Sequence, residues 1–202
     1  MTDIPRTDSA DQLSGGRPVF PSDRGLDADL VRRCRDGERS AFDQLVRQYE
    51  RPVFNLALRM TRNREDALDV TQTAFLKAFE RLHAYDPNYR FFSWIYRIAI
   101  NESLDLLASR RPGSEPVDDR LPDTTRRTPE SELGDAQFSA ALERAIEQLR
   151  PDHRAVVLLR HVADCSYAEI AHTLELPEKT VKSRLFSARQ ALREALDREG
   201  ML

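Results

Sequence analysis

The segment Tyr85-Asp-Pro-Asn-Tyr-Arg-Phe-Phe-Ser-Trp-Ile-Tyr-Arg-Ile-Ala-Ile-Asn101 holds the densest group of aromatic side chains in the sequence. Six of the 15 aromatic residues (nine Phe, five Tyr and one Trp in all) lie between residues 85 and 96, with arginines among them. A helix that starts near Phe91 turns Phe91, Ile95 and Ile98 to one face, so it cannot bury every ring. Rings exposed beside arginine suit unpaired nucleobases, which stack on aromatic faces and hydrogen-bond through their edges. The alternative is a helix packed on all sides in a small bundle.

Composition favours an all-α protein. The 202 residues have room for one or two small domains, and they include only seven glycines and few runs of β-branched residues. No apolar run reaches transmembrane length, and the first 25 residues lack the apolar core of a signal peptide. We therefore expect a cytoplasmic protein with no membrane insertion. The two cysteines, Cys34 and Cys165, are far apart in sequence and are expected to stay reduced.

The order of segments predicts two small helical domains joined by a flexible acidic linker. Residues 1–25 are rich in proline and glycine and are expected to be disordered. Residues 26–111 form the first predicted domain and residues 134–198 the second. Between them, residues 112–133 contain four prolines and six acidic residues. This linker is either a passive tether or an acidic strand that occupies a channel otherwise open to nucleic acid.

Helix signals divide the first domain. Asp27 is expected to cap a helix that ends at Asp36-Gly37, Ser40 with Asp43 resembles a capping box, and Pro52 fits the first turn of a further helix. Asn63 with Asp66 predicts another start, followed by a buried stripe of Leu68, Thr71, Phe75, Ala78, Phe79 and Leu82. The opposite face of that helix carries Asp66, Asp69, Thr73, Lys77 and Glu80, which form either a solvated surface or a docking surface for a partner.

The second domain contains a helix-turn-helix pattern. Pro151 is expected to start a helix. Ser166 and Glu169 predict a capping box, residues 174–177 a turn, and residues 180–196 a long basic helix with one buried face. Glu175 stands at the turn position where glycine is common. The alternative is a helical hairpin with a solvated basic face. The residues on this helix that we assign to duplex DNA are Thr180, Lys182, Ser183, Arg184, Phe186, Ser187 and Arg189, with Lys179 and Arg193 as further phosphate contacts.

Three segments in this order resemble the extracytoplasmic-function (ECF) sigma factors of bacterial RNA polymerase. They are Asp66-Ala-Leu-Asp-Val-Thr-Gln-Thr-Ala-Phe-Leu-Lys-Ala-Phe79, Phe92-Ser-Trp-Ile-Tyr-Arg-Ile-Ala-Ile-Asn101, and Ser166-Tyr-Ala-Glu-Ile-Ala171 followed by Thr180-Val-Lys-Ser-Arg-Leu-Phe-Ser-Ala-Arg189. The resemblance covers roughly residues 26–198. It departs from the family at Leu68 and Thr73, where acids are frequent, and at Ser187, where many relatives are basic.

The resemblance implies partners and roles. The first domain, as sigma region 2, would dock on the beta-prime clamp helices of core polymerase through Asp66, Asp69 and Gln72. The acidic linker would thread polymerase channels, and the second domain, as region 4, would read the minus-thirty-five element as duplex. An anti-sigma factor is a further expected partner, and the beta subunit another. The residues expected to hold the melted non-template strand of the minus-ten element are Tyr85, Trp94, Tyr96, Arg97, Ile98 and Asn101.

Other classes of function fit the sequence less well. An autonomous helix-turn-helix regulator would share the second domain, but its first domain would show alternating strands and helices. An enzyme is not favoured, because no glycine-rich phosphate loop or nucleophile elbow is present. No cofactor is expected, and His161, Cys165 and His172 lack the second ligand pair of a zinc site. A net charge of −3 is low for an unaided DNA binder and fits a subunit that binds promoters within polymerase.

Overall fold

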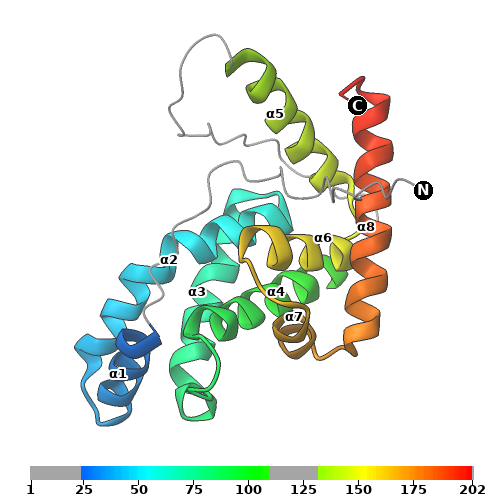
Figure 1. The fold of residues 1–202 in the computed structure, drawn as a ribbon. Coiled ribbons are helices and arrows are strands. Elements are labelled where there is room, and N and C mark those ends of the chain that lie inside the picture. The colour runs from blue at the N-terminus through cyan, green and yellow to red at the C-terminus, as the bar shows by residue number, and fades with distance from the viewer. Residues whose placement is uncertain (1–23, 110–131, 202) are drawn as a thin grey trace.

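The computed structural model describes residues 24–109 and 132–201, and within these ranges every regular element is a helix (Figure 1). The all-α prediction is therefore confirmed for this part of the chain. The expected disorder of residues 1–25 and the acidic linker expected at residues 112–133 lie largely outside it. At their inner ends the boundaries differ from the prediction, because Arg24 and Gly25 already belong to a helix and so do residues 132 and 133. Asp27 lies in the first turn of that first helix instead of capping it, and its carboxylate accepts a hydrogen bond from the Tyr49 hydroxyl. The elements are α1 (Arg24–Arg35), α2 (Arg39–Thr61), α3 (Arg64–Glu80), the short 3₁₀ turn η2 (Leu82–Ala84), α4 (Phe91–Ser109), α5 (Glu132–Gln148), α6 (Pro151–Val157), the π-helical turn η3 (Leu158–Val162), α7 (Tyr167–Leu174) and α8 (Glu178–Arg198).

Helix α2 is continuous, which corrects two predictions. Pro52 lies inside α2 and does not start a new helix, and Glu38, not Ser40, precedes the first turn. Ser40 donates its hydroxyl to the Glu38 carboxylate instead of capping the backbone. Proline removes one backbone hydrogen bond from the helix interior. The helix continues because its apolar stripe is buried on both sides of the proline, at Leu45, Tyr49, Val53, Leu56 and Met60.

Helix α3 begins where the sequence predicts, but it is rotated relative to the expected stripe. The Asn63 side chain accepts hydrogen bonds from the backbone N–H groups of Glu65 and Asp66, so the cap is confirmed. Leu68 and Phe79 were expected inside and are exposed. Small alanines allow α3 to approach its neighbours closely, and they set the buried face as Ala67, Val70, Thr71, Ala74, Phe75 and Ala78.

The helix-turn-helix is present in α7 and α8. Ser166 and Glu169 form the reciprocal capping box at the start of α7. Glu175, just after α7, has φ 53°, so a residue with a side chain occupies the left-handed position where glycine is common. Helix α8 begins at Glu178, two residues before the predicted start, and its buried face includes Val181, Leu185 and Ala188.

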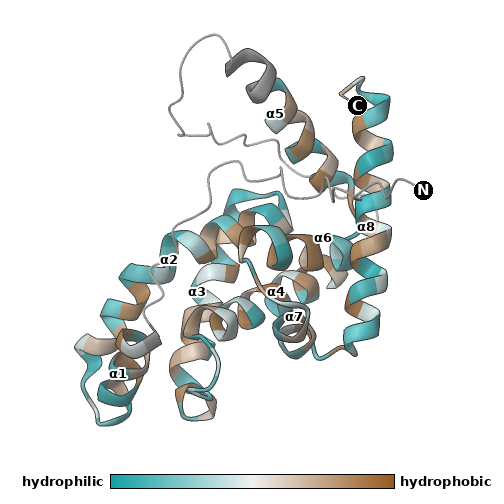
Figure 2. Cartoon of the chain, in the orientation of Figure 1, coloured by the Kyte–Doolittle hydropathy of each residue, from teal (hydrophilic) through white to brown (hydrophobic). Residues whose placement is uncertain are grey.

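The two halves of the described chain pack against each other. Helices α6 and α7 lie on α4, as Figure 1 shows, and α6 also contacts α2. The buried side chains of both halves form one continuous apolar cluster. Hydrophobic residues are concentrated on α4 and α6 where these helices meet (Figure 2). The surfaces of the first domain that face α6 and α7 are therefore covered in this arrangement.

Candidate polymerase and nucleic-acid interfaces

The predicted docking residues lie together on the outside of α3. Asp69 and Gln72 are exposed, and Asp66 is half-buried in the first helical turn. A carboxylate in the first turn is favoured there by the helix dipole. Leu68 and Leu76 are exposed on the same helix. This face therefore combines acidic, amide and apolar groups that a partner can contact together.

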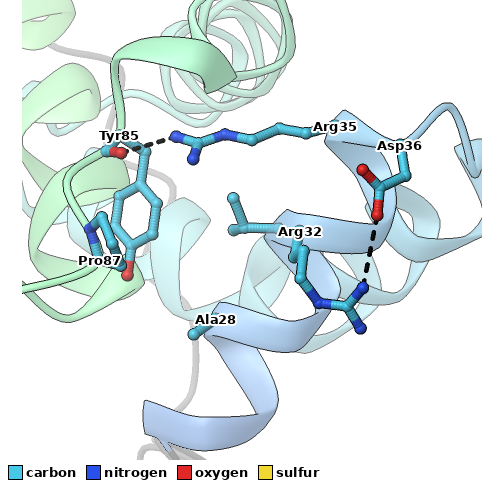
Figure 3. A pocket seen from close by; sticks show the side chains of 7 residues that line it. Ala28, Arg32, Arg35, Asp36, Tyr85 and Pro87 are labelled. Carbon is cyan, nitrogen blue, oxygen red and sulfur yellow. Dashed lines mark hydrogen bonds and ion pairs between the residues drawn. The ribbon is translucent and has the colours of Figure 1, made fainter.

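The loop before α4 is held in place from α1. The Arg35 guanidinium donates hydrogen bonds to the carbonyl oxygens of Leu82 (2.8 Å), His83 (3.2 Å) and Tyr85 (2.7 Å). Figure 3 shows Arg35 pointing toward Tyr85. Both residues line a hollow of about 340 Å³. These bonds satisfy the carbonyls that end η2, so they fix the backbone that carries Tyr85. The sequence does not predict this role, because no local pattern links Arg35 to a loop so far along the chain.

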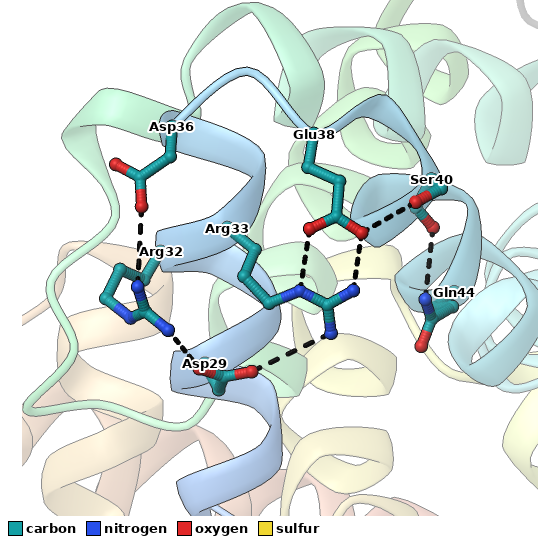
Figure 4. Close-up of polar contacts among 7 residues, drawn as sticks. All are labelled: Asp29, Arg32, Arg33, Asp36, Glu38, Ser40 and Gln44. Atoms are coloured by element: carbon teal, nitrogen blue, oxygen red, sulfur yellow. Dashed lines mark hydrogen bonds and ion pairs between the residues drawn. The ribbon is translucent and has the colours of Figure 1, made fainter.

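Ion pairs secure the end of α1 that carries Arg35. The Arg33 guanidinium donates two hydrogen bonds, of 2.8 and 2.5 Å, to the Glu38 carboxylate (Figure 4). The Arg32 guanidinium donates one of 2.5 Å to the Asp29 carboxylate. The bonds from Arg33 and then Ser40 lower the pKa of Glu38 to about 2. These groups are largely exposed, so each pair stabilises the fold only slightly. Their effect is to hold α1 and the start of α2 in one orientation.

Two aromatic rings that were expected to contact nucleobases are buried. Tyr85 is 4% exposed and packs against the rings of Phe91 and Trp94. Tyr96 is 1% exposed, with its ring edge-on to Phe92, and burial raises the pKa of its hydroxyl. Neither ring offers an open face in this arrangement. Tyr96 faces the interior, because it lies on the side of α4 that packs into the core.

The remaining candidates on α4 share one side of the helix. Trp94, Arg97, Ile98 and Asn101 follow helical spacing, with the first three partly buried and Asn101 exposed. The structure thus brings together an aromatic ring, a cation and an amide, which are the groups suited to a single strand. The Arg97 guanidinium forms an ion pair with Glu175, the residue that follows α7.

Tyr89 is a ring that the candidate set omitted. It is 37% exposed and stacks on the His172 ring of α7, with 4.1 Å between ring centroids and 5° between ring planes. Its position in the aromatic segment marks Tyr89 as a possible stacking residue. Because Tyr89 lies in a loop, helical spacing does not predict whether its ring is exposed.

Helix α8 separates a buried face from a basic outer face. Phe186 is 73% exposed, and Lys182, Ser183, Ser187 and Arg189 are also exposed. Thr180 is partly buried at the start of the helix. Lys182 makes a 2.7 Å ion pair with Glu178, and this hydrogen bond raises the pKa of Lys182. Arg184 is partly buried, and its guanidinium lies 3.8 Å from the Asp152 carboxylate. This separation is too long for a hydrogen bond, so Asp152 does not occupy the N–H groups of Arg184.

The three residues weighed as zinc ligands do not form a metal site. Cys165 is fully buried, and burial raises the pKa of its thiol to about 12. His172 is engaged with Tyr89. Among the described residues no group of three or more potential ligands could hold a metal ion. None of the helices in residues 24–109 and 132–201 has the length and apolar character to cross a membrane.

Comparisons with known proteins agree with this geometry. Sigma-70 region 2 matches residues 45–112, and Sigma-70, region 4 matches residues 139–192. The chain is 35% identical to RNA polymerase sigma-H factor of Pseudomonas aeruginosa, over 84% of this chain and 93% of that protein. It is 34% identical to ECF RNA polymerase sigma-E factor of Escherichia coli, over 85% and 94%.

A solved structure has the same fold. CnrH, in complex with the cytosolic domain of CnrY, is 28% identical, with a TM-score of 0.59 over 87% of this chain and 97% of that one. The region 2 match includes α3 and the aromatic segment, and the region 4 match includes the helix-turn-helix of α7 and α8. The chain belongs to the ECF family of RNA polymerase sigma factors.

Proposed function

We propose that this chain binds core RNA polymerase, recognises the minus-thirty-five and minus-ten elements of a promoter, and promotes DNA melting for transcription initiation. The observation that supports this most is the basic outer face of α8, opposite a fully buried apolar face. A structural helix needs the buried face but not the cluster of cations. In this proposal residues 26–111 act as region 2 and residues 134–198 as region 4.

Docking on polymerase is assigned to α3. Asp69 and Gln72 are exposed and Asp66 is half-buried, so an acidic surface is available to basic clamp helices of the beta-prime subunit. Exposed Leu76 adds apolar area next to these groups. The acidic groups would set the orientation of this chain on polymerase and the rate of association. Burial of the apolar side chain in the interface would contribute to the affinity.

Promoter recognition is divided between α8 and α4. The side chains of Lys182, Ser183 and Arg184 can reach base edges when α8 enters a major groove, while Arg189 lies where phosphates pass. Trp94, Arg97 and Asn101 face a melted strand. Extruding a base costs a few kcal/mol, which stacking and hydrogen bonds to the base edge offset.

Region 2 and region 4 must separate for this function, because α7 covers part of the α4 surface in the described arrangement. CnrH, a similar structure, is solved with a second protein bound. We propose that this chain likewise binds an anti-sigma factor, which would control when the two regions reach polymerase. No catalytic step of its own is part of the proposal, and its site of action is the cytoplasm, where polymerase transcribes.

The test is co-elution of the purified chain with bacterial core RNA polymerase. The wild-type chain is expected to co-elute, and an Asp66→Arg/Asp69→Arg variant is expected to be lost from the polymerase peak. The matched control is Asp43→Arg/Glu50→Arg, which makes the same charge change at exposed positions of α2. If the wild-type chain ignores core polymerase and binds duplex DNA alone, the alternative of an autonomous helix-turn-helix regulator replaces this proposal.

A further inference from the structure

Two side chains at the end of α7 contact the first domain in the way that the base and the phosphate of a bound nucleotide would. The His172 and Tyr89 rings are nearly parallel, at 5°, with centroids 4.1 Å apart. The other aromatic pairs in the described residues are tilted or edge-on, so Tyr89 and His172 are the one parallel pair among them. A parallel ring on an exposed tyrosine is the geometry of a stacked base.

An anion accompanies the ring. Glu175 lies three residues after His172 and forms an ion pair with Arg97 of α4. Its side chain is 69% exposed, so it enters this contact from the solvent side. A planar ring on Tyr89 and a negative charge on Arg97 are the two features that a nucleotide offers, as its base and its phosphate.

The space next to the stack is partly hollow. A cavity of about 130 Å³ is lined by Ser93, Trp94 and Arg97 of α4 and closed by His172 and Thr173 of α7. The Ser93 hydroxyl oxygen is buried without a hydrogen-bond partner of normal geometry among the described residues, although the Cys165 thiol lies near it. A buried polar atom is normally paired. A base edge in this hollow could supply the missing partner.

We propose that Tyr89 and Arg97 form a site for one nucleotide of single-stranded DNA, and that His172 and Glu175 occupy this site in the free chain. The inference rests on the proposed function and adds to it a stacking residue and a mode of regulation. Region 4 then competes with the melted strand for the same groups on region 2. The free chain therefore binds single strands poorly until polymerase or DNA draws α7 away.

The test compares wild type with four variants by fluorescence anisotropy. The probes are fluorescein-labelled dT12, dA12 and dC12, because stacking on tyrosine tolerates any base. His172→Ala/Glu175→Gln, which removes the internal occupant, is expected to bind about 10-fold more tightly than wild type. Adding Tyr89→Ala to this variant is expected to cancel the gain, whereas adding Tyr89→Phe, which keeps the ring, is expected to retain it.

The inference is overturned if the occupant variant binds no better than wild type, or if Tyr89→Ala leaves its gain intact. Glu194→Gln, on the exposed side of α8, removes one charge far from α7's end and is expected to leave binding unchanged. Core polymerase co-elution of the same variants separates the two hypotheses. If the wild-type chain and the occupant variant bind core polymerase but the variant shows no gain, this inference alone is contradicted. If the wild-type chain fails to bind core polymerase, the proposed function is contradicted.

Discussion

The Arg154 guanidinium of region 4 donates a 2.6 Å hydrogen bond to the carbonyl oxygen of Met60, near the end of α2 in region 2. The same side chain donates to three carbonyls at the end of α5 and just after it, those of Ile146, Glu147 and Leu149. It is 5% exposed, and burial followed by the charge of Arg62 lowers the pKa of Arg154 to about 10. One cation therefore joins three segments and ties the two regions together.

Replacing Arg154 with methionine is expected to destabilise the fold. The methionine fills the volume but leaves the carbonyls of Met60 and Leu149 buried without their donor. Hydrogen bonds to charged groups are each worth about 1.5–3 kcal/mol, and some of the carbonyls will gain water, so we expect a loss of roughly 2–4 kcal/mol. Chemical denaturation monitored by circular dichroism measures it.

The matched control for Arg154→Met is Arg150→Met. Arg150 has a largely exposed side chain and a long ion pair with Asp152, so its replacement should change stability by less than about 0.5 kcal/mol. Equal losses in the two variants would contradict the role assigned to Arg154.

Asn101 and Arg184 are expected to fail at different steps. Asn101→Ala removes an exposed amide from α4 and should impair promoter opening, seen as fewer thymines reactive to permanganate. Arg184→Ala removes a groove contact from α8 and should weaken duplex binding by about 1–3 kcal/mol, measured with the holoenzyme on a promoter mapped from its own transcripts. Core polymerase binding should stay unchanged in both. An equal loss of core binding would argue against both assignments.

The sequence predicted the features that depend on residues close together in the chain. The Asn63 cap, the helix start at Pro151 and the Ser166–Glu169 capping box each act within one helical turn, and each is confirmed. Pro52 was misread because a local break was weighed without the buried stripe that carries α2 through it.

Contacts between the regions could not be predicted in this way. The partners of Tyr89 and Arg97 lie in α7 and just after it, far along the chain, and no local pattern pairs them. The site residues on α8 could be predicted from the sequence, because the apolar face of a helix packs inward and its opposite face is then exposed. Those on α4 pack against region 4 as well as their own domain, so their exposure depends on an arrangement that periodicity does not encode.

Replacing Glu175 measures the backbone strain at the turn between α7 and α8. For a residue with a side chain, its left-handed φ of 53° lowers the free energy of unfolding by roughly 1 kcal/mol. Its exposed ion pair with Arg97 raises the free energy of unfolding by about 0–1 kcal/mol. Glu175→Gly is therefore expected to be slightly more stable than wild type. Glu175→Ala keeps the backbone cost and loses the pair, so it should be less stable. Denaturation midpoints give the order, and glycine no more stable than alanine would show that the turn is unstrained.

Alkaline pH should weaken the fold through Cys165. Burial raises the pKa of its thiol from 9.0 to about 12, so the folded chain keeps a proton that the unfolded chain releases above about pH 9. The unfolded state then binds fewer protons, and the unfolding free energy falls as pH rises from about 9 toward 12. Burial also raises the pKa of the Tyr49 and Tyr96 hydroxyls, which adds to the fall at higher pH. Cys165→Ala should show a shallower fall between pH 8 and 11, and an unchanged slope would contradict this cause.

Cys165 also gives a native probe of the separation of the regions. Its thiol lies near Ser93 and Tyr96 of α4 and is fully buried, so a Cys34→Ser chain should react slowly with iodoacetamide at pH 8. Core polymerase that draws region 4 away from α4 exposes the thiol and returns its pKa toward the ordinary value of a free thiol, which raises the thiolate fraction and the rate. The rate is read by mass spectrometry of the modified peptide. Serum albumin in place of polymerase is the control, and a rate that polymerase leaves unchanged would mean that regions 2 and 4 stay packed together in the holoenzyme.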